Sequence, residues 1–102
     1  MPEAEITVRC DRASEPMACD VCVREGKSET RHQVTMAKRD REHLAAGRTA
    51  EQIVEAAFRF LLDREVKESI LQRFDITVIA RYFPEFEREL PRYLAQKDPR
   101  DA

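Results

Sequence analysis

Alternating apolar and polar positions predict β-strands in the first third of the chain. The alternation occurs at Ile6, Val8 and Cys10, then at Cys19, Val21 and Val23, and then at His32, Val34 and Met36. A period of two places every second side chain on the same face of a sheet. Gly26 separates the second and third segments and is typical of a tight turn. We therefore expect three strands in an antiparallel meander.

Beyond Asp40 the hydrophobic period changes to that of helices. Asp40 can cap a short helix that runs through Leu44 to Ala46, and Gly47 suits the left-handed position after its end. Thr49 and Gln52 have the spacing of a capping box. The apolar residues that follow at helical intervals are Ala50, Ile53, Val54, Ala57, Phe58, Leu61 and Leu62. One face of this main helix is expected to lie on the apolar side of the sheet.

The last third is predicted to form short helices. Ile70, Leu71 and Phe74 fit a short helical segment, and Asp75 can cap another helix that begins at Ile76. Proline inside a helix loses a hydrogen bond, so Pro84 and Pro91 are each expected to begin a new short helix. The predicted fold class is α+β: a three-stranded antiparallel meander packed on one main helix and followed by short C-terminal helices.

The 102-residue chain is long enough for one domain with its own core, which we expect over residues 1–95. Residues 96–102 form a polar tail without an apolar stripe and are expected to fray.

The charge balance argues against nucleic-acid binding as the main activity. The net charge is −2 and the sequence pI is about 5.7, whereas general polyanion binders present a basic surface. Residues 31–48 carry a modest basic excess, which is interpreted as a solvated face or, as an alternative, as a site for an anionic ligand or RNA. The predicted strands lack aromatic residues on which bases could stack. The two glycines, Gly26 and Gly47, exclude a phosphate-cradling loop.

The cysteines are interpreted as free thiols rather than as a metal site. Cys19 and Cys22 lie three positions apart in a predicted strand, so their side chains face opposite sides. Cys10, Cys19 and His32 share a predicted strand face, which offers three soft ligands, but a fourth is not evident and structural zinc normally takes four. No metal or other cofactor is therefore expected.

A cytoplasmic location is expected for this chain. No apolar run approaches the length of ~20 residues that spans a membrane, and the N-terminus is acidic where a signal peptide would be basic and then apolar. A reducing compartment keeps thiols free.

Nothing in the chain indicates an enzyme. His32, His43, the cysteines and the serines lack the local motifs that surround activated nucleophiles.

The aromatic residues suggest a recognition surface instead. All seven lie in the second half, at Phe58, Phe60, Phe74, Tyr82, Phe83, Phe86 and Tyr93. A small sheet with aliphatic and sulfur side chains is not expected to cover all of them, which leaves either a helical subcore or an exposed apolar patch. The predicted partner-binding residues are Tyr82, Phe83, Phe86 and Tyr93.

These residues predict a non-enzymatic module that binds a protein partner or a second copy of itself, without nucleic acid or membrane as a partner. The alternative is a small-ligand-binding protein or an enzyme with a pocket between the sheet and the helices, lined by Arg31, His32 or Cys19.

Three short segments of the second half stand out: residues 67–71 (KESIL), 74–76 (FDI) and 81–87 (RYFPEFE). Together they resemble small uncharacterised bacterial proteins over about residues 49–89. The resemblance implies a bacterial origin and a small α+β domain. It brings no activity or site residues with it, and the cysteines lie outside the resembling stretch.

Overall fold

The computed structural model describes residues 4–96. In chain order its elements are β1 (Glu5–Asp11), β2 (Met17–Glu25), β3 (Ser28–Met36), α1 (Lys38–Ala45), α2 (Ala50–Leu62), the single-turn 3-10 helix η1 (Lys67–Ser69), β4 (Arg73–Asp75), α3 (Thr77–Tyr82) and α4 (Phe86–Gln96).

The first three strands form the predicted antiparallel meander, and the sheet order is β1-β2-β3-β4. Glu25 pairs with Ser28, which leaves Gly26 and Lys27 as the two turn residues of the hairpin. Gly26 has a φ of 62° at the first of these positions, where a side chain would be strained. The turn therefore depends on this glycine.

The fourth strand corrects the prediction of a helix at Ile70, Leu71 and Phe74. Residues Arg73–Asp75 form β4 instead, which pairs parallel to β3 with Phe74 opposite Val34. Phe74 packs against Phe58 of α2, with ring centroids 6.1 Å apart. A strand of three residues is too short to show a period, so this contact with a distant helix decides its conformation.

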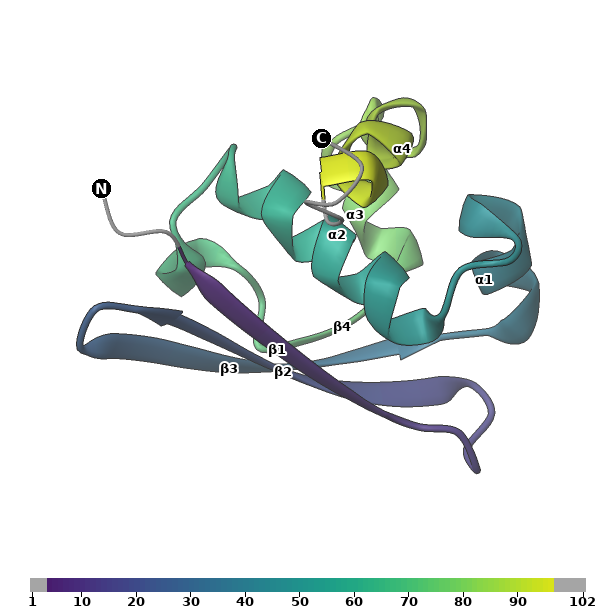
Figure 1. Ribbon diagram of the computed structural model, residues 1–102, viewed down its shortest axis with the longest axis horizontal. Coiled ribbons are helices and arrows are strands. Elements are labelled where there is room, and N and C mark those ends of the chain that lie inside the picture. The colour runs from purple at the N-terminus through teal and green to yellow at the C-terminus, as the bar shows by residue number, and fades with distance from the viewer. Residues whose placement is uncertain (1–3, 97–102) are drawn as a thin grey trace.

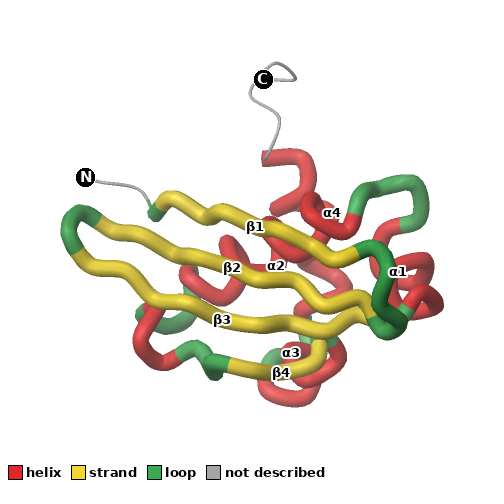
Figure 2. Tube along the Cα trace, turned by 90° about the horizontal axis from the view of Figure 1, so that it is seen from below, coloured by secondary structure: helices red, strands yellow, loops and turns green. Residues whose placement is uncertain are grey.

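The helices lie on one face of the sheet, and the other face is open (Figures 1 and 2). Side chains of β2 show the division clearly. Cys19, Val21 and Val23 are fully or almost fully buried, whereas Asp20 and Arg24 on the opposite face are exposed. The structure therefore has one layer of sheet and one layer of helices with the core between them.

Helix α2 confirms the main helix of the sequence analysis. The side chain of Thr49 accepts a hydrogen bond from the Gln52 N–H at 3.1 Å, and the Gln52 side chain accepts one from the Thr49 N–H at 3.0 Å. Phe58 and Phe60 are both fully buried. The ring of Phe58 contacts His32 and Phe74 of the sheet, whereas that of Phe60 contacts aromatic residues of the helical layer.

The prediction that Pro91 begins a helix is wrong, because Pro91 lies inside α4. An interior proline costs about 3 kcal/mol. Phe86, Leu90 and Leu94 of α4 are buried, and each contributes about 1.5–3 kcal/mol by leaving water. This burial outweighs the lost hydrogen bond. Pro84 precedes α4 by two residues, close to where a helix start was expected.

The start of α1 differs from the prediction, and the predicted C-terminal tail can be compared only at Gln96. Helix α1 begins at Lys38, so Asp40 lies in its first turn rather than at its cap. Helix α4 continues to Gln96, and the rest of the predicted tail, residues 97–102, lies outside the described residues. Within residues 4–96, no helix has the length and apolar character needed to cross a membrane.

Cys10 and Cys19 form a disulfide, which corrects their interpretation as free thiols. The register of β1 and β2 places these residues directly opposite one another on the core face. Adjacent positions of this kind bring the sulfurs together. Cys22, on the open face, is the free cysteine of the described chain.

We predict that the unfolded protein takes up one alkylating group without a reductant, at Cys22, and more after reduction. Reduction should also lower the free energy of unfolding by about 2–3 kcal/mol, the entropic effect expected for a closed loop of this size. Mass spectrometry and urea unfolding measure the two effects. Cys22→Ser is the control and should keep the sensitivity to reductant; complete alkylation without a reductant would contradict the disulfide.

Candidate functional site

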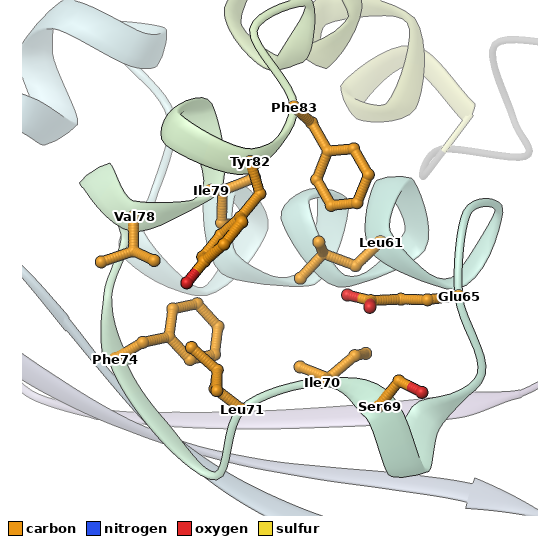
Figure 3. Close-up of a pocket in the computed structure, with 10 residues that line it drawn as sticks. All are labelled: Leu61, Glu65, Ser69, Ile70, Leu71, Phe74, Val78, Ile79, Tyr82 and Phe83. Carbon is orange, nitrogen blue, oxygen red and sulfur yellow. The ribbon is translucent and has the colours of Figure 1, made fainter.

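An apolar cavity of about 300 Å³ lies between the C-terminal end of α2, the segment that leads into β4, and α3. We call it the groove. It is lined by Leu61, Glu65, Ser69, Ile70, Leu71, Phe74, Val78, Ile79, Tyr82 and Phe83 (Figure 3). Since these residues come from elements on three sides, the groove exists only in the folded chain.

Exposed apolar side chains gather at the groove. Among the described residues, the large hydrophobic side chains that are exposed are Val66 at 64%, Leu71 at 50% and Tyr82 at 68%. Leu71 and Tyr82 line the groove, and Val66 follows the lining residue Glu65 in the chain. Clustered apolar exposure of this kind marks interaction sites, whereas single exposed residues need no explanation.

Glu65 gives the groove its charge. It is the one charged residue in the lining, and its carboxylate points into the cavity between Leu61 and Ile70 (Figure 3). No residue in the described range 4–96 forms a hydrogen bond or ion pair with this carboxylate. This carboxylate is therefore the group of the lining that could pair with a cation.

One wall of the groove is the segment from η1 to β4, which carries Leu71 and Phe74. Backbone hydrogen bonds join this wall to β3. The Gln33 N–H donates to the Gln72 carbonyl at 2.7 Å, and the Ile76 N–H donates to the Thr35 carbonyl at 2.8 Å. These backbone bonds fix β4 at the edge of the sheet.

Asp75 adds side-chain hydrogen bonds to the contact between β3 and β4. Its carboxylate accepts hydrogen bonds from the Thr35 hydroxyl at 2.6 Å, the Thr77 hydroxyl at 2.7 Å and the Thr77 N–H at 3.1 Å. Burial works against the charged form, but these three donors outweigh it and hold the pKa of Asp75 below its usual value. One side chain therefore links β3, β4 and the start of α3.

His32 is hydrogen-bonded to the segment that forms one wall of the groove. Its Nδ1 lies 2.8 Å from the Leu71 carbonyl oxygen, and its Nε2 lies 2.8 Å from the Thr30 hydroxyl. A carbonyl only accepts, so Nδ1 carries the proton. Cys10 and Cys19 are bonded to each other, and residues 4–96 hold no cluster of three or more possible metal ligands among His, Cys, Asp and Glu.

Lys67 anchors the other end of this wall. Its side chain is only 5% exposed, and its Nζ donates to Glu68 at 2.7 Å and lies 3.3 Å from a Glu25 oxygen at the β2–β3 turn. The hydrogen bond to Glu68 is the main cause of the raised pKa of Lys67. The wall is thus held at Lys67, at His32 and at β4.

A network around Arg64 fixes the α2 side of the groove. The Arg64 guanidinium lies 3.7 Å from the centre of the Phe60 ring, and its Nε donates to Glu85 at 3.0 Å. The Tyr93 hydroxyl donates to Asp63, and this bond, together with burial, raises the pKa of Tyr93. The end of α2 is thereby joined to the α3–α4 turn and to α4.

The structure divides the four predicted partner-binding residues into two pairs. Tyr82 and Phe83 line the groove, and Tyr82 is exposed. Phe86 is 1% exposed and Tyr93 is 7% exposed, and their rings lie 5.1 and 5.7 Å from that of Phe60. The second pair therefore belongs to the helical core.

Two of the three residues predicted to line a small-ligand pocket, Arg31 and His32, border an open hollow on the open face of the sheet rather than a pocket between the sheet and the helices. Cys19 is buried in the core, and none of the three lines the groove. Sequence reasoning missed Glu65, Leu71 and Val78. No local pattern could have revealed them, because they come from three separate segments whose proximity depends on β4.

Comparison with known proteins adds no relative: no family model matches the chain, and no curated protein or solved structure matches it either. The resemblance to small bacterial proteins stays a prediction.

We predict that Asp75→Asn lowers the free energy of unfolding by about 1–3 kcal/mol at neutral pH, because charge-assisted hydrogen bonds at the β3–β4 joint are lost. The folded pKa lies below the usual value of 3.8, so the stabilisation is complete above that value. It is lost as the pH falls through the folded pKa, and the variant and wild type should then converge.

Urea unfolding across acidic pH measures this difference. Asp20→Asn, on the open sheet face, is the matched control and should change stability little at any pH. A gap between Asp75→Asn and wild type that stays constant into strong acid would contradict the assigned role.

Proposed function

We propose that the protein is a non-enzymatic protein-interaction module whose groove receives one large apolar side chain of a partner protein. A lysine or arginine next to that side chain in the partner faces Glu65. The observation that carries the proposal is that two exposed apolar side chains, Leu71 and Tyr82, line one apolar cavity.

The volume of the groove suits a single anchor. At about 300 Å³ it lies at the lower end of the sizes found for small-molecule pockets. Protein interfaces commonly concentrate their affinity in one or a few side chains that fill such a pocket. Tyr82 and Phe83 supply aromatic surface, which interfaces favour.

The open rim favours a protein over a small ligand. Leu71 and Tyr82 are half or more exposed, so an occupant that filled only the cavity would leave them in contact with water. A partner whose surface continues beyond its anchor covers them as well. A small amine with an apolar group shares the same chemistry and is distinguished by the experiment below.

The cellular location stays a prediction. The Cys10–Cys19 disulfide counts against the cytoplasm, because disulfides persist mainly in oxidising compartments.

We predict that selection from a random peptide library on the immobilised protein enriches peptides with a large apolar residue beside lysine or arginine. Tyr82→Ala should weaken the selected peptides by about tenfold or more, since it removes aromatic area from the groove. Tyr82→Phe keeps the ring and should retain the affinity. Fluorescence polarisation of labelled peptides gives the dissociation constants.

Glu65→Gln tests the charge of the groove and should remove the preference for basic peptides. Glu42→Gln, an exposed position on α1, is the matched control and should have no effect. Enrichment of acidic peptides, or equal binding to the wild type and Tyr82→Ala, would contradict the proposal. Binding of small apolar amines without any selected peptide would favour the small-ligand alternative.

A further inference from the structure

The outer edge of β1 is an unpaired strand of seven residues. β1 lies at one end of the sheet order and pairs only with β2 (Figure 2). No backbone group on its outer side has a hydrogen-bond partner within the described part of the chain. Natural proteins usually protect such an edge with a proline, a bulge, a very short strand or charged side chains. β1 has no proline and a continuous register with β2, and its protection consists of the charged residues Glu5, Arg9 and Asp11.

The core side of β1 is apolar but only half covered. Ala4, Ile6 and Val8 pack against the core without being buried, whereas Val21 and Val23 on the same face of β2 are 2% and 0% exposed. Helix α2 lies against β1, but these side chains stay partly exposed because no further strand flanks this edge. A further strand beside β1 would complete the burial of these side chains.

The charges of β1 are complementary to themselves in one antiparallel register. If Thr7 lies opposite Thr7 of a second copy, Glu5 faces Arg9 of that copy and Arg9 faces its Glu5, while Ile6 faces Val8 on the core side. Centring the pair on Val8 instead would place Glu5 opposite Asp11, two like charges. Among pairs formed within β1, the register centred on Thr7 places no like charges opposite each other and is the favourable one.

Both charged residues are available for this pairing. Arg9 forms no ion pair with any of residues 4–96. Glu5 reaches only Arg24, at 3.8 Å and with both side chains largely exposed, a type of pair that contributes little.

We propose that two copies of this chain associate through antiparallel pairing of their β1 edges, with Thr7 on the two-fold axis and Glu5 opposite Arg9 at both ends. The two sheets become one continuous sheet, and the half-covered side chains of Ile6 and Val8 meet across the axis. The interface is isologous, as expected for a two-fold dimer. It is separate from the groove, which lies at the β4 side of the sheet.

Charge reversal tests the register. Sedimentation velocity of the wild type over concentrations up to about 1 mM should show a monomer–dimer equilibrium. Arg9→Glu places like charges opposite each other at both ends and should raise the dimer dissociation constant about tenfold or more, as should Glu5→Arg. The double variant Glu5→Arg/Arg9→Glu restores opposite charges and should recover dimerisation.

Matched controls separate the edge from other surfaces. Arg73→Glu makes the same charge change on β4 and should leave the dimer intact, as should Tyr82→Ala in the groove. Circular dichroism and urea unfolding verify that each variant is folded. A wild type that stays monomeric throughout would overturn the proposal. So would dimerisation that survives Arg9→Glu, or that is lost in Tyr82→Ala instead.

Discussion

The burial of α2 on two sides is the interaction on which the rest of the structure depends. Phe58 packs against His32 and Phe74 of the sheet, and Phe60 packs against Phe83, Phe86 and Tyr93 of the helical layer. Residues two positions apart on a helix point in widely separated directions, so one helix supplies the centre of both contacts. The sheet therefore does not have to cover every aromatic residue. A second part of the core, formed by helices around Phe60, encloses several of them.

The groove is a consequence of this arrangement. After α2 the chain must return from the helical layer to the sheet edge, form β4 and rise again into α3 (Figure 1). Polar contacts at Lys67, His32 and Asp75 hold this return segment. They fix its backbone while leaving Leu71 in contact with water. Apolar surface is thus displayed on a scaffold whose own stability does not require that surface to be covered, a property that suits recognition.

The two proposed surfaces are compatible because β1 and β4 form opposite edges of the sheet. Association through β1 leaves the groove open in each copy. A dimer would then present two grooves, and a partner with two matching anchors would gain affinity from the second binding event without any new contact in the first. The Cys10–Cys19 disulfide joins β1 to β2 and so keeps the edge strand in place beside the core.

Elements with a local signal were predictable from the order of residues alone. Alternation gave the three strands of the meander, and the Thr49 capping box with its apolar stripe gave α2. Long-range packing set four other features: the conformation of Phe74 in β4, the place of Pro91 inside α4, the bond between Cys10 and Cys19, and the division of the aromatic residues between core and groove. The physical reason is the range of the interactions. Periodicity and capping act within a few residues, whereas these features arise from contacts between segments that lie far apart in the chain or on different strands, and their energies override local preference.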